Sequence, residues 1–144
     1  MKKHTTLSCY TFSMKKLLLI STLLFSTLMF SSPSYGEWTK VSENVDGVSF
    51  YVDFERIRKH GGYFYFWSLT DYFKPTKYGH LSGKVYYQGD CKLFRQKMLN
   101  SSYHQEPMGN GLGAPGSNKG EMADWDYPPP NSSHEQVLKR VCSQ

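Results

Sequence analysis

Residues 63–73, with the sequence YFYFWSLTDYF, restrict the fold of this 144-residue chain more than any other segment. Aromatic residues favour strands, and the run starts directly after the permissive Gly61-Gly62 pair. Alternation along a strand predicts one face formed by Tyr63, Tyr65, Trp67, Leu69 and Phe73, and a second face formed by Phe64, Phe66 and Tyr72. Because both faces are partly apolar, each needs a cover. The chain must therefore build a sheet with other elements packed on it.

Shorter runs of the same character supply the other strands. They are separated by turn residues, which is typical of an antiparallel sheet. The predicted elements are strands at 38–41 and 48–52 around a turn at 44–47, a polar turn at 53–60, a hairpin of 84–88 and 93–103 that turns at 89–92, an exposed glycine-rich loop at 107–120, and a last short strand at 122–126 centred on Trp125.

The C-terminus predicts a helix. Ser132 and Glu135 have the spacing of a capping box, and the three prolines at 128–130 form a stiff spacer before it. An apolar stripe follows at helical spacing, made of Val137, Leu138, Val141 and Cys142. The fold class is therefore α+β, an antiparallel sheet with one C-terminal helix that covers one of its faces.

The N-terminal segment is typical of a secretory signal peptide. Two lysines follow Met14, an apolar run extends over 17–30, and small residues occupy positions 34 and 36. We therefore expect residues 1–36 to be removed by cleavage before Glu37, which leaves 37–144 as a single domain. Met14 makes a better signal-peptide start than Met1.

The apolar run is too short for a permanent membrane anchor. Fourteen residues reach about 21 Å as a helix, against a hydrocarbon core of roughly 30 Å. No cysteine follows the predicted cleavage point, so no lipid anchor is expected. These features predict an exported protein, periplasmic or secreted or at the cell surface, with no integral membrane span in its mature form.

The charge supports this division of the chain and argues against nucleic acid as a partner. The net charge is +5, but residues 1–36 hold four lysines and no carboxylate. The remaining 108 residues hold 13 basic and 12 acidic side chains and are almost neutral. A nucleic-acid surface needs an excess of positive charge that the mature domain lacks.

Two cysteines, Cys91 and Cys142, remain after the predicted cleavage. In an exported domain the simplest prediction is a disulfide between them, with a stabilising effect of roughly 4 kcal/mol. The alternative is a metal site, which needs three or four clustered ligands. The histidines at 60, 80, 104 and 134 are scattered in sequence and none forms a metal motif with a cysteine.

No catalytic motif stands out, so the sequence predicts neither an enzyme nor a cofactor or metal. Glycines 111, 113 and 116 match the letters of a dinucleotide fingerprint, but no helical pattern follows them. A surface for partners is the more productive hypothesis, since an exposed aromatic face can hold another protein. The candidate residues are Phe64, Phe66 and Tyr72 of the second strand face, together with the basic cluster Arg56, Arg58 and Lys59.

Several landmarks in fixed order resemble a known family. They are WTKVS at 38–42, FYVD at 50–53, FWSLTDY at 66–72, DC at 90–91, Trp125 and VC at 141–142. Over residues 37–142 the chain is similar to the surface-adhesin protein E-like family of exported bacterial proteins. The resemblance implies a six-stranded antiparallel sheet with a C-terminal helix held by a Cys91–Cys142 disulfide. It also implies binding to host matrix and serum proteins, which is what the founding adhesin does.

These observations favour an exported, non-enzymatic, adhesin-like module that contacts protein partners through its sheet and loops. The alternative is a small periplasmic ligand-binding or enzymatic domain with a pocket between helix and sheet. A third hypothesis is a homodimer, or a larger envelope assembly, joined through Phe64 and Phe66.

Overall fold

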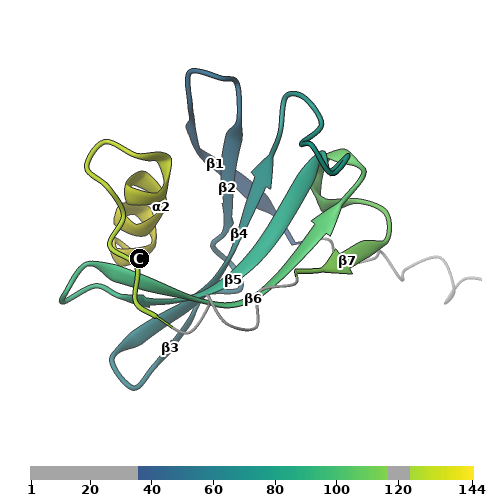
Figure 1. Cartoon of the computed structure of the whole chain (residues 1–144). Helices are drawn as coiled ribbons and strands as arrows, with labels where there is room; N and C mark the ends of the chain where they lie inside the picture. Colours follow the sequence, from purple (N-terminus) through teal and green to yellow (C-terminus); the bar gives the residue numbers. More distant parts are fainter. Residues whose placement is uncertain (1–35, 117–123) are drawn as a thin grey trace, which may run out of the picture. The chain divides into compact units, whose positions relative to one another are not determined.

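The computed structural model describes residues 36–116 and 124–144 (Figure 1). The predicted signal peptide therefore lies outside the described residues except for Gly36, and export stays a prediction. Described strands, in chain order, are β1 (Trp38–Glu43), β2 (Ser49–Asp53), β3 (Arg58–His60), β4 (Tyr63–Asp71), β5 (Ser82–Asp90), β6 (Arg95–His104) and β7 (Gly113–Pro115). A single 3₁₀ turn, η1 (Pro107–Gly109), and the helix α2 (Ser133–Cys142) complete the described elements.

The strands form one open antiparallel sheet in the order β1-β2-β4-β5-β6-β7. β2 and β3 pair one after the other with the same edge of β4: residues 49–52 with 68–71, and residues 58–60 with 63–65. The antiparallel α+β class is confirmed, but the described sheet has seven strands and not six.

Two of the strands replace predicted turns and loops. β3 lies inside the predicted polar turn 53–60, where a reverse turn at 54–57 brings three exposed residues alongside β4. β7 lies inside the predicted loop 107–120 and pairs with residues 102–104 of β6. Of the predicted strand at 122–126, residues 122 and 123 lie outside the described part of the chain, and Asp126 forms an isolated bridge with Gln96.

Alternation along β4 is as predicted, and it separates a helix face from a far face. On the helix face, Phe66 lies opposite Tyr87 with ring centroids 5.5 Å apart. Gly89 lies beside them, and a Cβ there would be 3.2 Å from Leu138 of α2 and 3.3 Å from the Phe66 ring. The core cluster on this face consists of Phe50, Val52, Phe66, Tyr87, Val137, Leu138 and Val141.

The far face is covered in part by η1. The backbone N–H of Met108 donates to Asp71, and that of Gly109 donates to the Ser82 hydroxyl over 2.8 Å. Leu69, two residues before Asp71 on the same face, is fully buried. β4 ends at Asp71, so Phe73 does not continue this face and is 73% exposed.

The start of α2 confirms half of the predicted capping box. The Ser132 hydroxyl accepts from the Glu135 N–H over 3.1 Å, while the Glu135 carboxylate accepts from the N–H of Asn131, one residue earlier than the motif predicts. At the other end, Cys142 forms the predicted disulfide with Cys91 in the β5–β6 turn, with Cα atoms 5.7 Å apart. Within the described residues no helix has the length and apolar character needed to cross a membrane.

Candidate functional site

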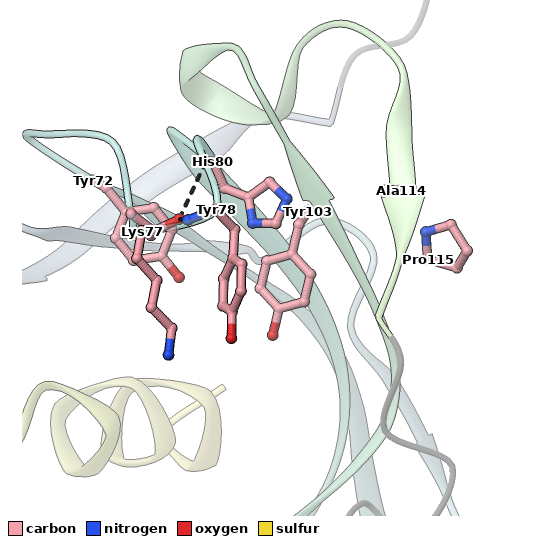
Figure 2. A pocket seen from close by; sticks show the side chains of 8 residues that line it. Tyr72, Lys77, Tyr78, His80, Tyr103, Ala114 and Pro115 are labelled. Atoms are coloured by element: carbon pink, nitrogen blue, oxygen red, sulfur yellow. Dashed lines mark hydrogen bonds between the residues drawn. The ribbon is translucent and has the colours of Figure 1, made fainter.

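The helix face is hollowed where the β4–β5 connection meets β6 and β7. Tyr103 of β6 lies on this face, because a Cβ at its neighbour Gly83 would be 3.2 Å from the ring and Gly83 alternates with the core residues of β5. We call this site the tyrosine pocket; its volume is about 750 Å³. Its lining residues are Tyr72, Thr76, Lys77, Tyr78, His80, Tyr103, Ala114 and Pro115 (Figure 2).

Local hydrogen bonds hold the β4–β5 connection in a tight turn. The Tyr72 N–H donates to the Leu81 carbonyl over 2.8 Å at its base, and the Thr76 N–H donates to the His80 carbonyl over 2.9 Å. The Thr76 hydroxyl accepts from the His80 N–H, and Gly79 takes the positive φ of +79° that the turn requires. This short turn fixes the backbone that carries Tyr78 and His80.

Two aromatic rings of the pocket are stacked, and a third lies tilted beside them. His80 lies on Tyr103 with ring centroids 5.2 Å apart and an interplanar angle of 17°, and Tyr78 lies 6.1 Å from His80. The Lys77 ammonium is 4.9 Å from the centroid of the Tyr78 ring. Figure 2 shows the hydroxyls of Tyr72, Tyr78 and Tyr103 and this ammonium pointing to the same side.

These groups make the pocket a donor-rich surface with apolar walls. Burial raises the pKa of Tyr72, with a smaller contribution from Tyr103, so the Tyr72 hydroxyl stays protonated and can donate. Lys77 is the only fully charged residue among the lining residues, which include no carboxylate. In the part of the chain that the structure describes, no three histidine, cysteine or carboxylate side chains are placed to hold a metal ion. The arrangement suits binding.

Only one of the predicted surface residues, Tyr72, lies in the pocket. Phe66 has no exposed surface because α2 covers it, and Phe64 is half-buried and packs against the same core. The predicted partner surface is therefore corrected: Phe66 belongs to the core, where its apolar ring lies under the C-terminal helix.

The three residues of the predicted basic cluster lie in different surroundings. The Arg56 Nε pairs with the buried carboxylate of Asp53, on the far face of β2. Lys59 donates to the carbonyl of Gln144 over 2.8 Å and lies 4.9 Å from the Phe64 ring, on the helix face. Arg58 is exposed on β3. The structure does not bring these cations together with Tyr72 in one patch.

Replacing Arg56 with alanine is expected to lower the free energy of unfolding by about 2 kcal/mol, because it leaves a buried carboxylate without its cation. Asp53 is fully buried, and its other oxygen accepts from the Arg56 N–H over 3.2 Å. Urea unfolding measures the change. Arg58→Ala, two residues away and exposed, is the matched control, and equal small losses in both variants would contradict the structural role of Arg56.

Sequence reasoning missed most of the pocket. Lys77, Tyr78 and His80 lie in a connection between strands, and Tyr103 lies 23 residues beyond His80. One signal was available: residues 72–81 contain two tyrosines, a phenylalanine and a histidine, which is a high aromatic content for a loop. Such content indicates that the side chains of this loop pack against another part of the domain.

The fold is shared with solved structures of Haemophilus influenzae protein E. Crystal form II of Haemophilus influenzae protein E is similar with a TM-score of 0.57 and 17% identity, covering 78% of this chain and 91% of that one. A second structure of Haemophilus influenzae protein E gives a TM-score of 0.54 and 15% identity, covering 78% and 88%. At these identities the likeness establishes the shared fold.

The sequence establishes the family. Residues 38–143 match the surface-adhesin protein E family, and the chain belongs to it. This is a family of adhesins and not of enzymes, in agreement with the non-enzymatic interpretation of the sequence. No curated protein matches the chain in sequence.

Proposed function

We propose that the chain is an exported, adhesin-like binding module that contacts protein partners through its sheet and loops, host matrix proteins among them. The observation that carries the proposal is the tyrosine pocket: a hollow lined by aromatic rings on the helix face, in a chain of an adhesin family. Tyrosine is enriched at the energetic centres of protein interfaces, since one ring offers both apolar area and a hydroxyl. Tyr78 is 69% exposed and available for contact.

Export is supported by two independent features. The segment 1–36 has the charged, apolar and small-residue regions of a signal peptide, with cleavage expected before Glu37. The Cys91–Cys142 disulfide fits an oxidising compartment, because disulfides are rare where glutathione keeps thiols reduced. We propose a periplasmic, secreted or cell-surface location on this basis.

A small-ligand carrier is the second candidate, since a volume of about 750 Å³ falls within the range of small-molecule sites. The pocket lies beside α2 and not beneath it, because Val137, Leu138 and Val141 fill the helix–sheet interface. Self-association stays a prediction. The predicted homodimer contact consists of Phe64 and Phe66. Because Phe66 is buried, only Phe64 of this pair could contribute to such a contact.

The test measures binding of the purified protein to a panel of purified matrix and serum proteins by surface plasmon resonance. A Kd in the micromolar range or tighter for at least one protein is expected, and Tyr78→Ala should weaken it about tenfold. Tyr127→Ala is the matched control, because Tyr127 is 58% exposed and lies outside the pocket lining. Absence of any protein partner, alongside tight binding of a small molecule, would replace this proposal with the ligand carrier.

A further inference from the structure

We infer that the tyrosine pocket binds an acidic, extended peptide segment of the partner protein. This inference rests on the proposed binding function and specifies the chemistry of the partner. It follows from the charge of the pocket, from its hydrogen-bonding groups and from the arrangement of its rings.

The charge of the pocket favours a negatively charged ligand. Residues 72–81 contain Lys74, Lys77 and a histidine but no carboxylate. Among the described residues, the ion pairs are Lys40–Glu43, Arg56–Asp53, Arg95–Asp90 and Lys139–Glu135, and none includes Lys77. An acidic side chain entering the pocket therefore meets an exposed cation whose charge no described carboxylate neutralises.

The hydroxyl groups favour a ligand rich in acceptors. Three tyrosine hydroxyls reach the same side as the lysine ammonium (Figure 2), and no hydrogen bond among the described residues uses them. The pocket therefore offers up to four donors on one side. A peptide presents backbone carbonyls at regular intervals, and glutamate or aspartate adds carboxylate oxygens, all of which are acceptors.

The rings favour an extended chain with apolar side chains between its acidic residues. His80 and Tyr103 are stacked, Tyr78 stands next to them, and Ala114 and Pro115 of β7 form the opposite wall. Surfaces lined by aromatic rings receive proline-containing segments, whose polyproline II backbone leaves its carbonyls free for tyrosine hydroxyls.

A sugar fits this lining less well. Neighbouring sugar hydroxyls are both donors and acceptors, and they are matched best by planar carboxylate, amide or guanidinium groups that bind two of them at once. The lining residues include none of these groups. The observations therefore favour a peptide over a glycan.

The test uses the purified protein and three labelled hexapeptides that alternate proline with glutamate, glutamine or lysine, followed by fluorescence anisotropy. We expect the glutamate peptide to bind with a micromolar-to-millimolar Kd, the glutamine peptide about fivefold more weakly, and the lysine peptide not at all. Lys77→Gln should reduce binding of the glutamate peptide about fivefold, to the level of the glutamine peptide. Lys139→Gln, which removes an exposed lysine of α2 that is paired with Glu135, should change nothing.

Equal binding of all three peptides, or no binding up to about 10 mM, overturns the inference. Binding of N-acetylneuraminic acid that depends on Lys77, without binding of any peptide, overturns it in favour of an acidic sugar. If a matrix protein binds but Lys77→Gln and Tyr78→Ala leave its affinity unchanged, the pocket assignment fails and adhesion remains. If the glutamate peptide binds through Lys77 and no protein of the panel does, the pocket assignment holds and the choice of matrix proteins is wrong.

Discussion

Replacing Cys91 and Cys142 together with serine is expected to lower the free energy of unfolding by about 4 kcal/mol. The disulfide spans 51 residues of chain, and in the loop-entropy account a cross-link of that span restricts the unfolded state by about this amount. A domain of this size has a total unfolding free energy of only about 5–15 kcal/mol, so much of the folded population would be lost on mild heating. Urea unfolding monitored by far-ultraviolet circular dichroism measures the loss.

The control is the unmodified protein with the disulfide reduced by dithiothreitol. Its unfolding midpoint should coincide with that of the double serine variant, since both lack the same cross-link and differ only in the two side-chain atoms. A loss below about 1 kcal/mol in both samples would contradict the prediction. It would mean that residual structure already restricts the unfolded chain as strongly as the covalent bond does.

Truncation of Phe66 to alanine is expected to cost about 3–5 kcal/mol. The ring is fully buried between Tyr87 and the residues of α2, so its removal leaves a cavity in the core that the neighbours cannot fill. Differential scanning calorimetry of the purified variant should show a fall in melting temperature that, for a domain of about 100 residues, amounts to at least 10 °C.

Phe73→Ala provides a matched control with the same change of side chain. Phe73 lies two residues beyond the end of β4 and is 73% exposed, so its loss should change the unfolding free energy by less than about 0.5 kcal/mol. If the two variants lost the same stability, Phe66 would not be a core residue, and the result would favour the predicted surface formed by Phe64 and Phe66.

The local sequence pattern predicts those parts of the fold in which a residue's secondary structure depends on its neighbours along the chain. The alternation of residues 63–71 is visible in the sequence because every second side chain meets the same environment. The cap at Ser132 requires only the N–H of Glu135, three residues away. The Cys91–Cys142 bond could be predicted because only two cysteines follow residue 36.

Strands that exist only through their partners could not be predicted. β3 consists of arginine, lysine and histidine, all exposed, and it is a strand because the turn at 54–57 places it along the first half of β4. β7 is Gly113-Ala114-Pro115, a composition typical of loops, and β6 supplies its hydrogen bonds. In both segments tertiary pairing outweighs intrinsic preference.

The pocket shares this origin, because its walls come from three separate stretches of sequence. The sequence predicts a role for Tyr72 from its place at the end of the aromatic strand, but its neighbours in space depend on the register of β5 with β6, which sets Tyr103 opposite Gly83. A shift of that register by one residue would turn the Tyr103 ring to the far face and remove the site.

The disulfide also determines what a protease can do to this molecule. The bond encloses the chain from Cys91 to Cys142, which includes Tyr103 and the wall formed by β7. Leu112, just before that wall, is 97% exposed and is an open target for cleavage. A cut there produces two polypeptides that stay covalently attached, so that the nicked protein keeps its full mass until it meets a reductant. Outside the cell, where reductants are scarce, cleavage at Leu112 alone would not release β7 from the part of the chain that carries the pocket tyrosines.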